Sequence, residues 1–366
     1  MSASHSLHKS HWWAWAAPLG ALALLAAKYG GVLYPNDSAV VVVASVFLLA
    51  SVFAAVHHAE VVALKVGEPF GSILLALAVT VIETSLIVTA MLSGGAGENS
   101  LARDTVFSAV AIVLNGVVGL CLLVGGVRYH EQVFRVRGTA SALSVLATLA
   151  VLALVLPNYT LAKLGPQYSP TQLVFISALS LILYGVFVFV QSVRHRDYFL
   201  PEKGGDHGEE PASPSAGMTA ASVVMLLVSL LAVVLLAETL SESLEHSIHA
   251  AGLPASFLGV IIAALVLLPE GVAAVKAAHA NQVQTSLNLA IGSALASIGL
   301  TIPTVAGVSL YLGRELTLGL DAEGMAILLL TLFVSSITLA TGRATILQGA
   351  VHLVIFGVFL LLAAVP

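Results

Sequence analysis

Long apolar stretches, separated by short polar or turn-forming breaks, follow one another from residue 14 to the end of the chain. Each is about 20 residues long, which is the length that an α-helix needs to cross the hydrocarbon core of a bilayer. The pattern predicts about eleven transmembrane helices, over residues 14–34, 38–58, 69–93, 105–127, 139–157, 171–193, 219–240, 254–276, 284–311, 324–341 and 344–365. Because only Gly342-Arg343 separates the last two, they are expected to form a tight helical hairpin.

Composition agrees with this pattern. The 366 residues are 58% hydrophobic and 9% charged, with a mean hydropathy of +1.02. Soluble cores do not contain so many long apolar runs, so the expected fold class is an all-α polytopic membrane protein embedded in the lipid bilayer. The single cysteine, Cys121, excludes an intrachain disulfide. A net charge of −5 without a basic aromatic stripe argues against nucleic acid as a partner.

The distribution of Lys and Arg predicts the orientation. The first apolar stretch does not end in a small-residue cleavage site, so it is expected to remain as a leading helix. If the N-terminus is cytoplasmic, ten of the 14 basic residues fall on the inner side and four on the outer side. Positive charge favours the cytoplasmic side, so this orientation, with the C-terminus outside, is the predicted one.

A polar stretch at residues 197–217 divides the chain into two halves. It is acidic and rich in Pro, Gly and Ser, which predicts a cytoplasmic linker; a cation-sensing or regulatory loop is the alternative. The predicted organisation is residues 1–37 as N-terminal segment with the leading helix, 38–196 as a first five-helix repeat, 197–217 as the linker, and 218–366 as a second five-helix repeat.

Two glutamates, Glu83 and Glu270, lie inside the third and the eighth predicted spans. Spans five apart cross the membrane in opposite directions, so the halves are predicted to form an inverted repeat with its substrate site near the midplane. A carboxylate at this depth costs about 2.5–3.5 kcal/mol on insertion scales. The two groups are therefore expected either to compensate each other or to bind a ligand that compensates both, and they are the candidate metal ligands.

Other oxygen atoms near these glutamates are candidates for completing a cation site. Thr80 precedes Glu83 by one helical turn. Pro269, beside Glu270, cannot donate to the carbonyl of Leu265, which leaves a backbone oxygen available to a hard cation. The alternative is a structural kink at Pro269, with Glu270 hydrogen-bonded to a neighbouring helix.

Polar side chains also occur in the span after each acidic span. Asn115, Asn288 and Ser293 supply neutral oxygens and are candidate cation ligands. They lie beside Gly116 and Gly292, so close helix packing is the alternative explanation, most of all for the glycines and Ser293.

Histidines and glutamates gather near the ends of the second and seventh spans, where they are candidates for proton relay or gating. They are Glu60, Glu242, Glu245, His57, His58, His246 and His249. Polar residues at helix ends are common in membrane proteins, so an interfacial role without transport chemistry is the alternative.

Four segments carry a resemblance to a known family. GEPFGSILLALAVTVIETSLIV with RDTVFSAVAIVLNGVVG, and LVLLPEGVAAVKAA with NLAIGSALASIGLTIP, resemble the two repeats of the calcium/cation exchanger superfamily, most of all its bacterial ChaA-type calcium/proton antiporters. The resemblance spans nearly the whole chain. It implies that Glu83 and Glu270 are the family's paired acidic residues, and that the chain exchanges Ca²⁺, with Na⁺ or K⁺ as further substrates, for H⁺ across the bacterial inner membrane. It implies no enzymatic step and no cofactor.

The sequence departs from the family pattern at one place in each repeat. Many calcium/proton exchangers have Gly-Asn four and three residues before the glutamate, whereas this chain has Val79-Thr80 and Val266-Leu267. Two amide oxygens are missing from their usual positions, so the ion preference stays open.

Two other function classes remain as alternatives. An intramembrane metal-dependent hydrolase would use His57-His58 with Glu60, or His246 and His249 with Glu245, but no complete zinc motif or serine elbow accompanies them. A passive cation channel would usually repeat one filter among subunits. The sequence does not predict stoichiometry, oligomeric state or the side on which the resting protein is open.

Overall fold

The computed structural model describes residues 12–31, 38–67, 70–92, 99–199 and 214–366, including all side chains in these ranges except those of Ser38, Ser72 and Glu242. Helices dominate this part of the chain. Their bounds are α1 (Trp12–Tyr29), α2 (Ser38–Val66), α3 (Phe70–Leu92), α4 (Leu101–Ala111), α5 (Val118–Tyr129), α6 (Val136–Ala150), α7 (Pro170–Phe189), α8 (Ala216–Ala250), α9 (Phe257–His279), α10 (Val283–Ala296), α11 (Ile302–Leu312), α12 (Ala322–Ala340) and α13 (Ile346–Ala364).

Short segments of other geometry connect or interrupt these helices. π-helical turns occupy Ile112–Val117, Val151–Val155, Val190–Arg194 and Ser297–Thr301, and 3₁₀ turns occupy Leu156–Tyr159 and Arg196–Tyr198. Two short strands, β1 (Gln132–Val133) and β2 (Arg343–Ala344), pair antiparallel.

Ten helical segments in the described residues are long and apolar enough to cross a membrane. The pairs α4–α5 and α10–α11 each form one such segment, through a π-helical turn. With α1 in addition, the helices account for all eleven predicted spans, and the expected helical membrane fold is confirmed. Helix α1 is not among the ten. It has 18 residues, with Pro18 inside it and three tryptophans, Trp12, Trp13 and Trp15, in its first turn.

Two helices run further than their apolar stretches predict. The second span was expected to end at residue 58 but α2 continues to Val66, and the seventh was expected to end at residue 240 but α8 continues to Ala250. Hydropathy shows where the chain becomes polar. A helix ends, in contrast, where a residue leaves the helical backbone conformation. The first positive-φ glycines after these stretches are Gly67 and Gly252, with φ of 75° and 70°.

The chain forms two compact units. One consists of Met1–Ser93 and Gly204–Leu244, and contains α1, α2, α3 and most of α8; the other consists of Gly94–Lys203 and Glu245–Pro366. Each predicted repeat contributes helices to both units.

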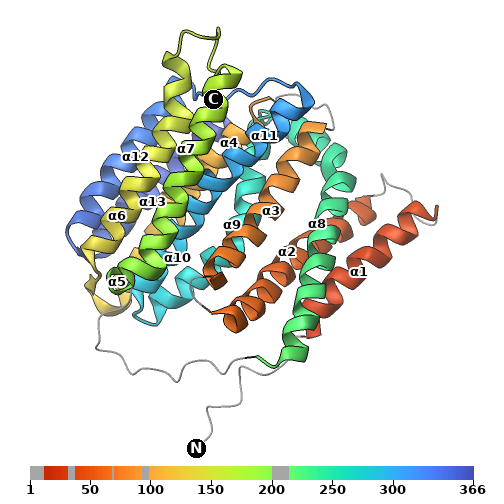
Figure 1. Cartoon of the computed structure of the whole chain (residues 1–366), viewed down its shortest axis with the longest axis horizontal. Coiled ribbons are helices and arrows are strands. Elements are labelled where there is room, and N and C mark those ends of the chain that lie inside the picture. The colour runs from red at the N-terminus through yellow and green to blue at the C-terminus, as the bar shows by residue number, and fades with distance from the viewer. Residues whose placement is uncertain (1–11, 32–37, 68–69, 93–98, 200–213) are drawn as a thin grey trace, which may run out of the picture. The chain divides into compact units, whose positions relative to one another are not determined.

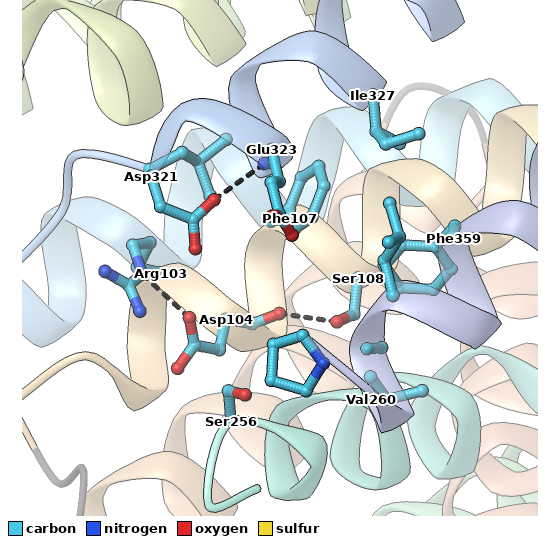
Figure 2. Close-up of a pocket in the computed structure, with 15 residues that line it drawn as sticks. Arg103, Asp104, Phe107, Ser108, Ser256, Val260, Asp321, Glu323, Ile327 and Phe359 are labelled. Atoms are coloured by element: carbon cyan, nitrogen blue, oxygen red, sulfur yellow. Dashed lines mark hydrogen bonds and ion pairs between the residues drawn. The ribbon is translucent and has the colours of Figure 1, made fainter.

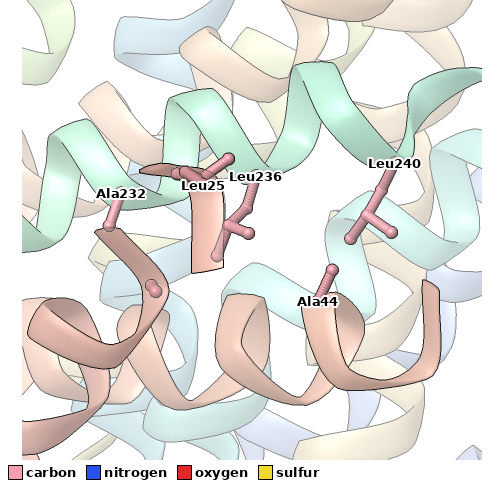
Figure 3. Close-up of a cluster of buried hydrophobic side chains, with 6 residues drawn as sticks. Leu25, Ala44, Ala232, Leu236 and Leu240 are labelled. Atoms are coloured by element: carbon pink, nitrogen blue, oxygen red, sulfur yellow. The ribbon is translucent and has the colours of Figure 1, made fainter. Parts of the chain in front are cut away.

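In the first unit, α1 and α2 pack together with α8 (Figure 1). Figure 3 shows the buried cluster that joins them, in which Leu25 lies beside Leu236, and Leu240 faces the small side chain of Ala44. Small side chains let the helix backbones approach closely. Beside this cluster, Lys28 donates a hydrogen bond from Nζ to the hydroxyl of Thr239 over 3.2 Å.

In the second unit, α5 packs along α13, and α9 packs between α4 and α10. Close approach depends on glycine: a Cβ on Gly259 would lie 2.7 Å from the backbone of Asp104, on α4. The α12–α13 connection is the tight hairpin that the sequence predicts. It turns at Gly342, with φ of 70°, and Thr345 starts α13 with a capping box to Gln348.

Strand β2 of this connection pairs with β1 of the α5–α6 connection, with Gln132 opposite Ala344. An ion pair between Arg343 and Glu131, 3.4 Å apart, lies beside the ladder. Two connections more than 200 residues apart in the chain are therefore joined at one end of the unit.

Candidate functional site

Glu83 lies in the interior of α3, where its side chain is only 2% exposed. Thr80, one turn earlier, is also buried and donates its hydroxyl to the carbonyl of Ala76 over 2.8 Å. This bond uses the hydroxyl proton and leaves the oxygen lone pairs of Thr80 able to accept. A buried carboxylate and a buried threonine oxygen therefore lie on neighbouring turns of α3.

Glu270 lies in α9, which continues as a helix through Pro269. Its side chain is partly buried, and Pro269 before it is buried. A Cβ on Gly271 would lie 3.3 Å from a methyl carbon of Val117, in the π-helical turn between α4 and α5. Glycine at this position lets that turn pack against the backbone beside the carboxylate.

The two acidic helices share one feature of position. Glu83 lies in the interior of α3 and Glu270 lies in the interior of α9, each more than two helical turns from the described ends of its helix. The two helices belong to different compact units.

Asn115 lies in the π-helical turn Ile112–Val117 and is completely buried. Its amide nitrogen donates to the hydroxyl of Thr331 on α12 over 2.8 Å. Its amide oxygen lies 3.2 Å from Nδ1 of His352 on α13. The predicted cation ligand thus belongs to a hydrogen-bonded group that includes a histidine not predicted from the sequence.

Asn288 and Ser293 lie on α10, in the corresponding span of the second repeat. The amide nitrogen of Asn288 donates to the carbonyl of Phe199 over 2.5 Å, and its oxygen accepts from Gln284 over 3.0 Å. Ser293 is partly buried. Both precede the π-helical turn Ser297–Thr301. The polar residues of that turn, Ser297 and Thr301, were not predicted from the sequence as site residues.

The histidines of α2 pack against α1. His58 is buried, with Nε2 3.1 Å from the carbonyl oxygen of Ala14 and Nδ1 3.3 Å from the hydroxyl of Ser222. Its ring meets Trp15 edge-on at 5.2 Å, and His57 lies against Trp13 at 5.9 Å. The contacts of His58 hold the leading helix to α2 and α8.

The remaining candidates for proton relay lie toward helix ends. Glu60 is exposed on α2; on α8, Glu245 is partly buried and His246 and His249 are exposed. Glu242 lies on the same helix, and its side chain is outside the described residues. Across the part of the chain that the structure describes, no three His, Cys, Asp or Glu side chains are grouped to hold a metal ion.

A pocket opens where α4 and α12 begin and α13 ends (Figure 2). Arg103 donates from Nε to Asp104 over 2.7 Å and from Nη1 to the carbonyl of Gly319 over 3.2 Å. Asp104 also accepts from Ser100, and Asp321 caps α12 through the amide of Gly324. Asp104 and Asp321 therefore already have hydrogen-bond partners around this pocket.

The family model described as sodium/calcium exchanger protein matches the chain twice, over residues 38–193 and 221–365. The chain belongs to the sodium/calcium exchanger family. Each matched segment contains one acidic helix, α3 or α9, and the span that follows it.

Two curated relatives and one solved structure align with most of the chain. The chain is 52% identical over 360 residues to the putative ionic transporter y4hA of Sinorhizobium fredii, covering 97% of this chain and 96% of the relative. It is 35% identical over 330 residues to the sodium-potassium/proton antiporter ChaA of Escherichia coli, covering 89% of each. A crystal structure of the H⁺/Ca²⁺ exchanger CAX superposes with a TM-score of 0.73 at 19% identity, covering 97% of this chain and 89% of that one, which shows a shared fold.

Proposed function

We propose that the chain is a secondary active cation/proton antiporter that exchanges Ca²⁺, and also Na⁺ or K⁺, for H⁺. The observation that carries this proposal is that each of the two family matches contains one helix with a glutamate in its interior, Glu83 in α3 and Glu270 in α9. The name of the Escherichia coli relative, a sodium-potassium/proton antiporter, supports the monovalent ions as substrates. The name of the CAX structure supports Ca²⁺.

In this mechanism the two carboxylates meet at the bilayer midplane and are neutralised alternately by cation and by protons. A divalent cation cancels both negative charges, and two protons do the same. The empty site, with two uncompensated charges in a medium of low dielectric constant, is the least favourable state to carry across. The protein then changes its open side only when the site is filled, which gives exchange instead of leak.

Neutral oxygens complete the site in this proposal. The hydroxyl of Thr80 and the amide oxygen of Asn115 serve the first repeat, while Asn288 and Ser293 serve the second. Ca²⁺ takes about six to eight oxygen ligands. Two carboxylates do not supply that many, so neutral oxygens are needed as well. The ions are transported substrates, and no cofactor or covalent step is part of the cycle.

The proposed location is the inner membrane of a bacterium, with the N-terminus in the cytoplasm. The excess of Lys and Arg on the inner side supports this orientation. The residues 197–217 then lie in the cytoplasm, as the link between the two repeats.

Reconstitution in proteoliposomes tests the function. We expect an inside-acid pH gradient to drive uptake of ⁴⁵Ca²⁺, ²²Na⁺ or ⁸⁶Rb⁺ with proton release, measured side by side, and a protonophore to abolish uptake. A passive channel would instead conduct each ion down its own gradient after protonophore addition. A metal-dependent hydrolase would retain stoichiometric zinc after purification and show no proton-coupled flux.

A further inference from the structure

A buried polar group joins three helical segments of the second compact unit. It consists of Asn115 in the π-helical turn, Thr331 and Thr338 on α12, and His352 on α13, none of which is more than 4% exposed. Ser335 lies between the two threonines on α12 and is also buried. Burying polar side chains within membrane spans is energetically costly. Such residues therefore usually have a functional role.

The hydrogen bonds of this group assign a role to each atom. Asn115 donates its amide protons toward Thr331, so its oxygen is the acceptor for Nδ1–H of His352. In the neutral ring, Nε2 then accepts from the hydroxyl of Thr338, 3.1 Å away. The imidazole thus contacts Thr338 through one nitrogen and the amide of Asn115 through the other, and the backbone of Leu114 is a further hydrogen-bond partner of the ring. A carbonyl oxygen has two lone pairs, and His352 uses one of them.

Two glycines set the spacing between α5 and α13, and so the position of the His352 ring. A Cβ on Gly119 of α5 would lie 3.0 Å from Cβ of His352, and a Cβ on Gly349 of α13 would lie 2.5 Å from the backbone nitrogen of Leu123. Larger side chains at either glycine would separate α5 from α13. Helix spacing and hydrogen-bond length are therefore coupled.

The same π-helical turn touches the acidic helix of the second repeat. Val117, two residues after Asn115, contacts Gly271, next to Glu270. A side chain that fixes this turn also fixes the surface against which α9 packs beside its carboxylate.

We propose that His352 is a positioning residue for cation binding: anchored by Thr338, it holds the amide of Asn115 so that the remaining lone pair of its oxygen faces the cation path. This inference rests on the proposed antiporter function, because Asn115 is a cation ligand only in that proposal. It assigns transport significance to a residue in the last helix, outside both acidic spans.

Two amide replacements of His352 separate its two bonds. Asparagine places an amide near the position of Nδ1 and retains the donor to Asn115, whereas glutamine reaches the position of Nε2 and retains only the contact with Thr338. Ile355→Ala is the matched control, because Ile355 is buried one turn further along the same helix and its truncation leaves a void without removing a polar group. The readouts are KM for the transported cation in proteoliposomes and thermal unfolding in detergent.

We expect His352→Gln to raise KM about tenfold, as the loss of one buried hydrogen bond implies. His352→Asn, which keeps the bond to Asn115 but loses the one to Thr338, should raise KM by a smaller factor, and Ile355→Ala should stay within about twofold of wild type. In an Asn115→Ala background, His352→Gln should have no further effect, because the two residues act through one contact. Equal KM values for the Asn and Gln variants would overturn the inference.

Thr331→Val supplies a second test that does not depend on folding of the His352 variants. It replaces a hydroxyl by a methyl group of similar size and removes the other anchor of the Asn115 amide. KM should rise by a similar factor, and a wild-type KM would contradict the proposal. Failure of the wild-type protein to exchange any cation for protons would instead refute the proposed function, which keeps the two failures distinct.

Discussion

His58 supplies the hydrogen-bond donor that Pro18 withholds from the carbonyl of Ala14. In a helix this carbonyl would accept from the amide four residues later, but proline has no amide proton. Nε2 of His58 lies 3.1 Å from the oxygen, from the neighbouring helix α2. The proline in α1 and the histidine in α2, expected from the sequence to act in proton relay, are thus linked by one orphaned backbone group.

Removing the ring should therefore destabilise the leading helix more when the proline is present than when it is absent. His58→Leu is expected to lower the free energy of unfolding by about 1–3 kcal/mol, the cost of leaving a buried acceptor unsatisfied. In the Pro18→Ala background, where the amide of residue 18 serves the carbonyl, the same change should cost less. Thermal unfolding of the four variants in detergent measures this coupling, and additive effects would exclude it.

Tyr168 performs a comparable task near the start of α7. Its hydroxyl donates to the carbonyl of Leu152 over 2.6 Å. Leu152 lies in a π-helical turn, where the amide five residues later would donate, but that residue is Pro157. Burial raises the pKa of Tyr168 to about 12.

This shift gives a pH dependence of stability with a definite sign. Tyr168 ionises near pH 10 in the unfolded chain but only near 12 in the folded one. Its contribution is present below pH 10 and is lost as the pH rises through 12. Tyr168→Phe should be about 1 kcal/mol less stable than wild type at pH 8, and the gap should narrow between pH 10 and 12. Unfolding temperatures at pH 8 and pH 11 test this; a constant gap would show that the phenol does not titrate with folding.

Glu83→Gln and Glu270→Gln should each abolish proton-coupled exchange while leaving the protein folded. The amide keeps the size of the side chain but can neither ionise nor provide the charge that balances a cation. Everted vesicles or proteoliposomes report the exchange, and gel filtration in detergent reports the fold. Glu315→Gln serves as control, since Glu315 is an exposed glutamate outside the spans that pairs with Lys163. Exchange at the wild-type rate by either variant would remove that residue from the site.

Calcium should bind more weakly as the pH falls, because both carboxylates must lose their protons to coordinate it. Calcium titrations of the detergent-solubilised protein between pH 6 and 8.5 measure the dependence, and proton release on calcium addition measures its stoichiometry. An affinity independent of pH would be incompatible with one site shared by the two ions.

The helical class and the acidic pair were accessible from sequence because both depend on local rules. Apolar length predicts spans, and a carboxylate such as Glu83 stands out against twenty apolar neighbours. His352 is also an ionisable residue inside a span, in α13, so the same rule applies to it. The histidines at the ends of α2 and α8 stand out more in the sequence because glutamates accompany them.

Other features depend on contacts between distant segments. The pairing of His58 with Ala14 requires knowing that α1 lies along α2, and hydropathy contains no information on that. The bond of Asn288 to the carbonyl of Phe199 joins α10 to a segment 89 residues away. Helix α8 continues past residue 240 through polar residues that form helix well. A hydropathy window ends the span there because these residues are polar.

The short ladder between β1 and β2 has a mechanical consequence. It fastens the tip of the α5–α6 pair, from the first half of the chain, to the tip of the α12–α13 pair, from the second. Tilting one pair alone would break these backbone hydrogen bonds and the packing of α5 on α13 and of α6 on α12, so the movements of the two pairs are coupled.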